Sequence, residues 1–232
     1  MATAKHPRRR AGERGSAERD RVVQALLAAY REGAFPMADG PRGRVRFYTA
    51  DPRAIVPIEK APGEGGGVVV SRSLRALLKG CPFEISSDRA FGEVIRACAK
   101  VPRGEEGGGG GGTWISEEIV GWYEALHAAG HAHSVEAWRE GRLVGGLYGV
   151  HIGGAFFGES MFSLPEQGGS NASKVCFVHL VKHLRAIGVV LLDTQFINPH
   201  MASLGAVEIP LKEYLARLAN AVSVDVRWGD WV

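Results

Sequence analysis

Two short apolar runs, each followed by a carboxylate, constrain the fold of this chain most. Residues 156–158 (Phe-Phe-Gly) lead into Glu159, and the run at 189–192 ends at Asp193. A carboxylate that closes a hydrophobic strand lies at the edge of a sheet, where burial shifts its pKa and a substrate can reach it. Gln195 follows Asp193 by two positions and points to the same side if the strand continues. We therefore expect a site beside an apolar pocket.

The polar residues at these strand ends allow two interpretations. Asp193 and Gln195 suit the orientation and deprotonation of an amine nucleophile, or the binding of a water that performs this step. Alternatively, Asp193 caps a turn and Glu159 is solvated, which the spacing allows equally well. Apolar side chains on adjoining elements form either a slot for a bulky apolar group or ordinary core. These are Leu147, Phe156, Phe157, Phe177, Leu180 and Leu192.

The charge of the chain does not by itself predict nucleic-acid binding. The whole chain of 232 residues carries a formal charge of +3, but its first 21 residues hold seven Lys or Arg against three Asp or Glu. That start accounts for +4, which leaves about −1 for the remainder. A surface for phosphate must therefore come from local clustering.

Cysteine and histidine spacing favours neither a disulfide framework nor a metal site. Cys81, Cys98 and Cys176 are an odd number and show no C-x-x-C spacing, so we expect reduced thiols and a cytoplasmic protein. His179 and His183 share one helical face, but the Glu of an H-E-x-x-H motif is absent. No apolar run approaches the roughly 18 residues of a membrane span, and no signal peptide is recognisable.

Apolar spacing and turn residues divide the chain into three parts. Residues 1–15 are expected to be a disordered basic tail. Residues 16–66 form a small N-terminal domain that begins with a helix capped by Ser16, and the Pro- and Gly-rich stretch at 41–67 marks its boundary. Residues 67–232 combine helices with an antiparallel meander, which predicts an α+β fold with a mainly antiparallel sheet flanked by helices.

Two local patterns are relevant to phosphate binding. The six glycines at 107–112 are followed by Thr-Trp-Ile rather than Lys-Ser/Thr, so we expect a flexible loop and not a P-loop. Arg72, Arg75 and Lys79 recur at i, i+3 and i+7, which places three cations on one face of a short helix. This face suits a phosphate backbone, and a solvated helix face explains it as well.

Ordered segments of the chain carry a family resemblance over about residues 25–218. They are residues 29–37 (AYREGAFPM), 51–54 (DPRA), 113–115 (TWI), 131–138 (HAHSVEAW), 143–150 (LVGGLYGV), 158–163 (GESMFS), 171–174 (NASK), 193–195 (DTQ) and 203–206 (SLGA). In these segments the sequence resembles the leucyl/phenylalanyl-tRNA protein transferases. The resemblance implies a small N-terminal α/β lobe followed by a lobe with the GNAT-type acyltransferase fold.

The same resemblance implies an activity and its partners. Such an enzyme moves Leu or Phe, less readily Met, from aminoacyl-tRNA to acceptor proteins that begin with Arg or Lys, and so marks them for N-degron proteolysis. The reaction is aminolysis of an ester, which needs no metal or redox cofactor because positioning and help with one proton suffice. We accordingly expect a cytoplasmic monomer without cofactor, metal or membrane association.

Matched onto this chain, the resemblance assigns residue roles. Asp193 and Gln195 would assist the attacking amine, and Glu159 would help to bind and align the substrates. Whether Asp193 acts as a base or the ribose hydroxyl assists is open. The remaining implied contacts are Leu147, Phe156, Phe177, Leu180 and Leu192 for the transferred side chain, Trp114 and Tyr48 for the terminal adenosine or aminoacyl group, and Arg72, Arg75 and Lys79 for the acceptor stem of the tRNA.

Two other functions remain compatible with parts of the sequence. A GNAT-fold acetyltransferase would need a Q/R-x-x-G-x-G/A loop to grip the pyrophosphate of coenzyme A, and the chain has no full match to it. A non-catalytic binder of tRNA or of basic N-termini is the other alternative. The presence together of Glu159, Asp193 and Gln195 argues against this binder.

Overall fold

The computed structural model describes residues 11–58, 67–101 and 113–232. Its helices are α1 (Ala11–Arg31), α2 (Arg72–Lys79), α3 (Phe91–Lys100), α4 (Glu117–Ala128), the short 3₁₀ helix η2 (Pro165–Gln167), α5 (Ala172–Ile187), α6 (Pro199–Ser203) and α7 (Leu211–Ser223). Its strands are β1 (Phe35–Ala38), β2 (Val45–Tyr48), β3 (Arg53–Val56), β4 (Glu84–Ser87), β5 (Ala132–Arg139), β6 (Arg142–Ile152), β7 (Ala155–Ser163), β8 (Leu191–Gln195) and β9 (Val207–Ile209).

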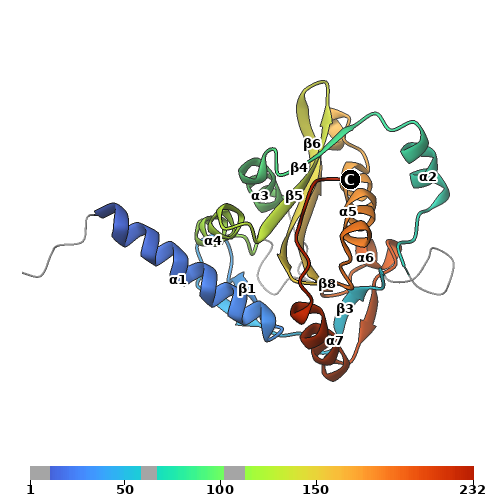
Figure 1. Ribbon diagram of the computed structural model, residues 1–232. Coiled ribbons are helices and arrows are strands. Elements are labelled where there is room, and N and C mark those ends of the chain that lie inside the picture. Colours follow the sequence, from blue (N-terminus) through green and yellow to red (C-terminus); the bar gives the residue numbers. More distant parts are fainter. Residues whose placement is uncertain (1–10, 59–66, 102–112) are drawn as a thin grey trace, which may run out of the picture.

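A seven-stranded sheet organises the molecule, in the order β4-β5-β6-β7-β8-β3-β9. Neighbouring strands pair antiparallel except β7 and β8, which run parallel. Helix α5 covers one face of the sheet, whereas α3 and α4 lie on the other (Figure 1). The predicted α+β fold, with a mainly antiparallel sheet flanked by helices, is confirmed.

Strand β3 joins the start of the chain to the large sheet. It pairs with β8 on one side and β9 on the other, although it belongs to residues 16–66. Within the described part of this segment, residues 16–58, β1 and β2 form a separate two-stranded hairpin. The sequence could not show this insertion, because nothing local in a four-residue strand encodes a partner about 140 residues away. The division into a 16–66 and a 67–232 domain stays a prediction.

Several expected boundaries differ from the structure or lie outside it. Helix α1 begins at Ala11, before the expected cap Ser16, and residues 1–10 of the expected basic tail lie outside the described residues. The capping preferences of Ser87 and Asp88 predict that one of them caps helix α3, but the N-cap is Ala90. Asp88 instead accepts hydrogen bonds from the β5 segment. The expected glycine loop at 107–112 and most of the linker near residue 66 also lie outside the described residues.

Local sequence explains the other helix ends well. Ser71 and Ser116 cap α2 and α4 through their hydroxyl oxygens, which accept from the backbone N–H groups of Leu74 and Ile119. Helix α5 ends at Gly188, whose φ of 89° suits a residue without a Cβ atom. These ends fix the helices that pack against the sheet.

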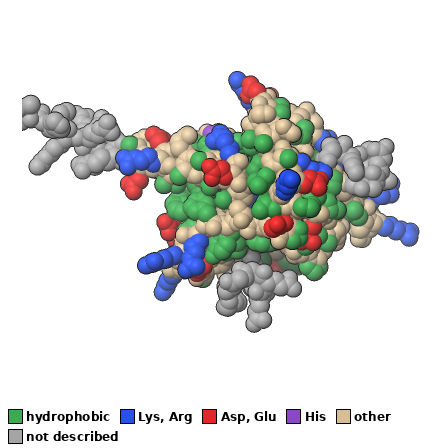
Figure 2. Space-filling model, turned by 90° about the horizontal axis from the view of Figure 1, so that it is seen from below, with side chains coloured by type: hydrophobic (Ala, Val, Ile, Leu, Met, Phe, Trp, Pro, Cys, Tyr) green, Lys and Arg blue, Asp and Glu red, His purple; other side chains and the backbone are tan. Residues whose placement is uncertain are grey.

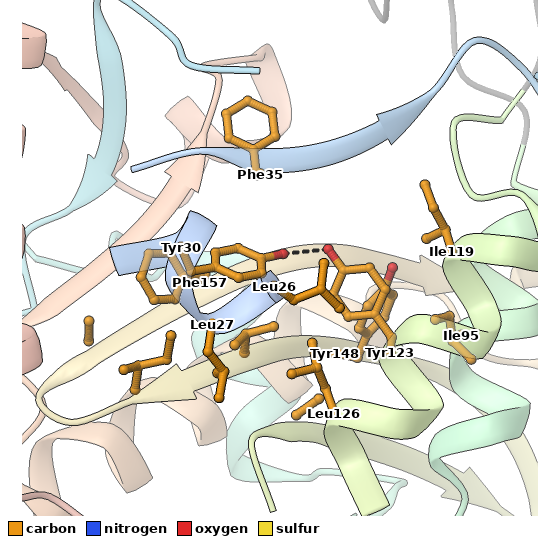
Figure 3. Packing of buried hydrophobic residues seen from close by; sticks show 14 of the residues in the cluster. Leu26, Leu27, Tyr30, Phe35, Ile95, Ile119, Tyr123, Leu126, Tyr148 and Phe157 are labelled. Atoms are coloured by element: carbon orange, nitrogen blue, oxygen red, sulfur yellow. Dashed lines mark hydrogen bonds between the residues drawn. The ribbon is translucent and has the colours of Figure 1, made fainter. Parts of the chain in front are cut away.

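The buried side chains form two clusters, one on each face of the sheet. One contains residues of α1, α3 and α4 packed on β6 and β7, and Figure 3 shows its centre, where Tyr30 from α1 meets Tyr123 from α4. The other lies between the sheet and α5 and includes Phe156, Phe177 and Leu192. Among the described residues, no helix has the length and apolar character to cross a membrane.

The last residues of the chain run across the sheet without helix or strand. Trp228 stacks on His133 with ring centroids 4.0 Å apart, and Trp231 packs against His183 at 4.8 Å. His183 also contacts the backbone oxygen of Trp228 through Nε2, at 3.0 Å. This C-terminal segment therefore belongs to the packed body of the molecule (Figure 1).

A β-bulge interrupts the pairing of β6 with β7. Tyr148 lies opposite Ser160 and Gly149 opposite Gly158, so Glu159 is the extra residue without a partner. The bulge is possible because Gly149 has no side chain: a Cβ atom there would stand 2.3 Å from the backbone oxygen of Phe157. Glu159 is thereby turned toward the interior from a strand that otherwise follows a regular register.

Replacing Gly149 by alanine should destabilise the protein by about 2–3 kcal/mol, because the added methyl group overlaps backbone that cannot yield without opening the bulge. Urea unfolding measures this loss. Gly158→Ala is the matched control on the opposite strand, since its Cβ would meet the backbone oxygen of Asp193 at an ordinary 3.5 Å. Similar stability of the two variants would contradict the structural reason given for Gly149.

Candidate active site

A cavity opens where β7 and β8 separate. The two parallel strands pair only at Ala155–Leu191, Phe156–Leu192 and Phe157–Asp193, and beyond these pairs they diverge. The cavity between them has a volume of about 300 Å³. It is lined by Phe35, Met37, Val101, Trp114, Leu147, Tyr148, Gly158, Glu159, Ser160, Met161, Phe177, Leu180, Thr194, Gln195, Phe196, Asn198, His200 and Met201.

Part of the site expected from the sequence meets in this cavity. Glu159, Gln195 and Trp114 line it, as do three of the five expected apolar contacts, Leu147, Phe177 and Leu180. Phe156 and Leu192 do not line it, because both are fully buried in the cluster beneath α5. Tyr48 and Asp193 are likewise absent from its wall.

Glu159 sits in a ring of three hydrogen-bonding groups. The hydroxyl of Tyr30 lies 2.8 Å from Oε1 of Glu159, and that of Tyr123 lies 2.9 Å from Oε2. The two tyrosine hydroxyls also contact each other, as Figure 3 shows. Two phenols supply two protons for three contacts, so a protonated Glu159 completes the ring with one proton in each contact. Helices α1 and α4 are thus tied to β7 at the edge of the cavity.

The surroundings of Glu159 favour its protonated form. Burial raises its pKa to about 7, although the hydrogen bonds from Tyr30 and Tyr123 oppose the shift, and the nearby Asp193 carboxylate raises the pKa further. Burial and Glu159 raise the pKa of both tyrosines well above the ordinary value, so the phenols remain neutral donors. The cavity wall therefore contains a carboxyl group that exchanges its proton near neutral pH.

Asp193 forms a buried ion pair with Arg53. Nε of Arg53 lies 2.9 Å from Oδ1 of Asp193 and Nη2 lies 2.6 Å from Oδ2, and both side chains are 0% exposed. The guanidinium group lies between the rings of Phe35 and Tyr214, 4.6 Å from each centroid. Burial alone lowers the pKa of Arg53, but the Asp193 carboxylate outweighs it and raises that pKa. The guanidinium group of Arg53 therefore stays charged beside the carboxyl group of Asp193.

Two further donors complete the contacts of the Asp193 carboxylate. The hydroxyl of Tyr214 donates to Oδ2 at 2.8 Å, and the backbone N–H of Gln195 donates to Oδ1 at 2.9 Å. With Arg53, this makes four charge-assisted hydrogen bonds on one buried carboxylate. Asp193 hence lies behind the cavity wall and acts on it through Gln195.

Gln195 occupies an unusual backbone conformation at the end of β8. Its φ is 58°, in the left-handed region that non-glycine residues rarely adopt, and the bond from its N–H to Asp193 holds it there. With the side-chain amide assigned so that nitrogen faces oxygen, Nε2 donates to the backbone oxygen of Gly158 at 2.9 Å. Gln195 thus bridges the gap between β8 and β7 at the cavity wall.

The sequence reading gave no role to four residues that organise these two carboxylates. Tyr30 and Arg53 stand in the matched segments 29–37 and 51–54, so the resemblance offered a signal for them. Tyr123 and Tyr214 lie outside these segments, and spacing alone does not show that a buried phenol faces a carboxyl group. Their hydroxyls make them part of the site.

The expected basic cluster lies on α2. Arg72, Arg75 and Lys79 are all exposed, whereas Leu74 is buried beneath the helix in the cluster under α5. The three cationic side chains together form a solvent-facing surface on α2. Among the described residues, no group of three His, Cys, Asp or Glu side chains is placed to hold a metal ion.

The sheet and cavity define a class of protein. A mainly antiparallel sheet that opens at the parallel β7–β8 pair over an apolar cavity, with a carboxyl and an amide in the wall, is an α+β fold with the features of an enzyme active site. Sequence models described as leucyl/phenylalanyl-tRNA protein transferase and its N-terminal domain match residues 65–219 and 23–51. The chain belongs to the leucyl/phenylalanyl-tRNA protein transferase family.

Relatives of the same name come from several bacteria. The protein from Chlorobaculum parvum is 48% identical over 201 residues, which cover 87% of this chain and 95% of the relative. The protein from Gloeobacter violaceus is 46% identical over 205 residues, which cover 88% of this chain and 96% of the relative. The protein from Rubrobacter xylanophilus is 49% identical over 203 residues, which cover 87% of this chain and 95% of the relative.

Solved acetyltransferase structures resemble the chain only weakly. The PaiA N-acetyltransferase from Thermoplasma acidophilum, in complex with coenzyme A, gives a TM-score of 0.31 at 13% identity and covers 46% of this chain and 75% of that one. A tandem GNAT protein from the clavulanic acid biosynthesis pathway gives a TM-score of 0.36 at 11% identity and covers 79% of this chain and 58% of that one.

The stability of the protein should depend on pH through Glu159. Its pKa is about 7 in the folded state against 4.5 as the ordinary value, so the folded state holds the proton more tightly. This contribution is fully present below pH 4.5 and is lost as the pH rises through 7, which amounts to on the order of 3 kcal/mol. Urea unfolding of the wild type and Glu159→Gln between pH 5 and 8 measures it. Parallel pH curves for the two proteins would exclude a raised pKa.

Breaking the Arg53–Asp193 pair should cost about 3–5 kcal/mol, because either single change leaves a charge buried without its partner. Arg53→Met and Asp193→Asn, combined in a double-mutant cycle by urea unfolding, should show strong coupling. The exposed pair Arg217–Glu213, 2.7 Å apart, is the control and should lose less than about 1 kcal/mol. Additive losses at Arg53 and Asp193 would refute the coupling.

Proposed function

We propose that this chain transfers Leu or Phe, less readily Met, from aminoacyl-tRNA to the N-terminal Arg or Lys of acceptor proteins, and so marks them for N-degron proteolysis. The names of the relatives support transfer from tRNA to protein. The observation that carries the proposal is the cavity between β7 and β8, which combines an apolar interior with a polar wall.

The cavity suits the side chain that would be transferred. Leu147, Phe177 and Leu180 offer apolar contact to a Leu or Phe side chain, and Met161 and Met201 add adaptable thioethers. A pocket of this kind binds Leu and Phe by burial, whereas a charged side chain would lose its hydration without a partner. The acyl group would thereby be fixed with its ester carbonyl beside Glu159 and Gln195.

The chemistry needs a neutral amine and a well-oriented ester. The α-amine of the acceptor attacks the carbonyl carbon, the bond to the ribose oxygen of the terminal adenosine breaks, and the amine proton is passed to the departing oxygen. An α-amine has a pKa of about 8, close to that of Glu159, so proton exchange between the two groups costs little. We assign Glu159 to alignment of the amine and exchange of its proton.

Gln195 and Asp193 are assigned complementary tasks. The amide of Gln195 lines the cavity and would orient the attacking amine. Asp193 is fully buried with four donors on its carboxylate, so it would act as a positioning residue that fixes Gln195 and not as the base. Direct assistance by the ribose hydroxyl of the tRNA is compatible with this assignment.

The tRNA would occupy a larger surface. The exposed Arg72, Arg75 and Lys79 of α2 would contact the acceptor stem through phosphates. Trp114 in the cavity wall and Tyr48 on β2 are assigned to the terminal adenosine and aminoacyl group. We further propose that the protein acts as a cytoplasmic monomer.

Labelled Leu-tRNA should transfer its leucine to a peptide that begins with Arg and not to an otherwise identical peptide that begins with Glu. The leucine side chain fits the apolar cavity, and the first residue of the peptide decides whether the peptide is accepted. Scintillation counting of the peptide measures the product. If neither peptide is labelled from Leu-tRNA or Phe-tRNA, the proposed transfer activity is wrong, and a non-catalytic tRNA binder becomes the better description.

Two variants separate chemistry from tRNA binding in the same assay. Gln195→Ala should lower the rate of transfer at least tenfold with little change in tRNA affinity, whereas Arg72→Glu should mainly weaken tRNA binding. Equal, small effects of both changes on both quantities would refute the roles assigned to these residues.

A further inference from the structure

The hairpin of β1 and β2 concentrates positive charge beside the cavity. Arg42, Arg44 and Arg46 are exposed within one short stretch, against the single acidic residue Asp39. The chain beyond its first 21 residues carries a net charge of only about −1, so three arginines within five positions are a local excess. The hairpin is separate from the large sheet and from α2.

Strand pairing places these arginines on the same face as the cavity. Phe35 lies opposite Tyr48 and Met37 lies opposite Arg46, and directly opposed residues of an antiparallel pair point to one side. Since Phe35 and Met37 line the cavity, Tyr48 and Arg46 stand next to its wall. Arg44 directly precedes β2, and its backbone oxygen accepts from the N–H of Asp39 at 3.1 Å, so the pairing and its alternation extend to Arg44 and place it on the same face. The face thus runs from the cavity outward as Tyr48, Arg46 and Arg44, over roughly 13 Å.

The ion pair within this face does not block it. Arg46 lies 3.2 Å from Asp39, with the two side chains 64% and 42% exposed, and the hydroxyl of Tyr48 donates to the same carboxylate at 3.2 Å. An exposed pair of this kind contributes little stability and exchanges easily with another anion. Asp39 therefore holds Arg46 and Tyr48 together while leaving the arginines able to meet phosphate.

We propose that the face of β2 formed by Arg44, Arg46 and Tyr48, with Arg42 at the turn, binds the unpaired 3′-terminal nucleotides of the tRNA as their aminoacyl end enters the cavity. Single-stranded RNA is bound by cations that follow its phosphates and by aromatic rings on which bases stack, and this face offers both. The inference rests on the proposed function, because it takes the RNA end that the transfer reaction would bring to the cavity.

This hairpin surface differs from the basic surface of α2 in what it would contact. Helix α2 packs toward α5, whereas the hairpin packs toward α1 and α4 on the other face of the sheet. Paired and unpaired parts of one tRNA can therefore be held by separate cations. Loss of the hairpin arginines should then weaken only the contact to the unpaired end.

The test compares an intact tRNA with the same tRNA shortened by its unpaired 3′ nucleotides. Filter binding between 50 and 200 mM salt gives the Kd for wild type and for the double variant Arg44→Glu/Arg46→Glu. For intact tRNA, the double variant should bind at least tenfold more weakly and show a salt slope smaller by about 0.7 per lost phosphate contact. For shortened tRNA, wild type and double variant should bind equally.

Matched variants separate charge from structure. Arg142, the first residue of β6, pairs with Glu140 at 3.3 Å and is 70% exposed, so Arg142→Glu should leave the Kd for both RNAs within twofold. Arg44→Lys/Arg46→Lys keeps the charge and should restore most of the affinity. Arg72→Glu should weaken the binding of both RNAs.

Each outcome decides the proposal. The proposal is overturned if Arg44→Glu/Arg46→Glu weakens the binding of both RNAs equally or weakens the binding of neither. If wild type transfers leucine to the Arg peptide while the double variant binds intact tRNA normally, the hairpin inference alone is wrong. If wild type transfers nothing and binds intact and shortened tRNA equally, the proposed function and the inference resting on it are both wrong.

Discussion

The buried ion pair of Arg53 with Asp193 is the interaction on which the site depends. It joins β3 to β8 within the sheet, and Nη1 of Arg53 also donates to the backbone oxygen of Gly33 at 3.0 Å. Tyr214 of α7 donates to the same carboxylate, so α7 is connected to the ion pair as well. Removing two charges from water is expensive unless every lone pair is met, and here four donors meet them. The end of β8, and with it Gln195, is fixed by this arrangement.

A second buried carboxylate is organised in the opposite way. Asp193 is paired with an arginine, whereas Glu159 is hydrogen-bonded to two phenols and has a pKa of about 7. The two groups also influence each other, since the charge on Asp193 raises the pKa of Glu159. One pair of acidic residues thus supplies an arginine-paired carboxylate behind the wall and a titratable group in it.

Sequence reasoning found the fold class and the two carboxylates that follow apolar runs, because these are local patterns. The expectation that the carboxylates close their strands at the edge of a sheet was wrong, since Glu159 and Asp193 lie inside the central strands β7 and β8. Sequence reasoning did not find that β3 lies in the large sheet or that Asp193 faces away from the cavity. Both depend on contacts between residues about 140 positions apart, namely Arg53 with Asp193 and Ala54 with Gln195. Of the apolar residues assigned to the pocket, Phe156 and Leu192 proved to be core, since spacing cannot tell which face of a strand meets a void.

The ring of Tyr30, Tyr123 and Glu159 has one more consequence. Its oxygens are buried at the edge of the cavity, so the protons between them are protected from exchange with bulk water. Any molecule that enters the cavity and touches Glu159 changes their shielding. The protein therefore carries an intrinsic nuclear magnetic resonance reporter at the edge of its own site.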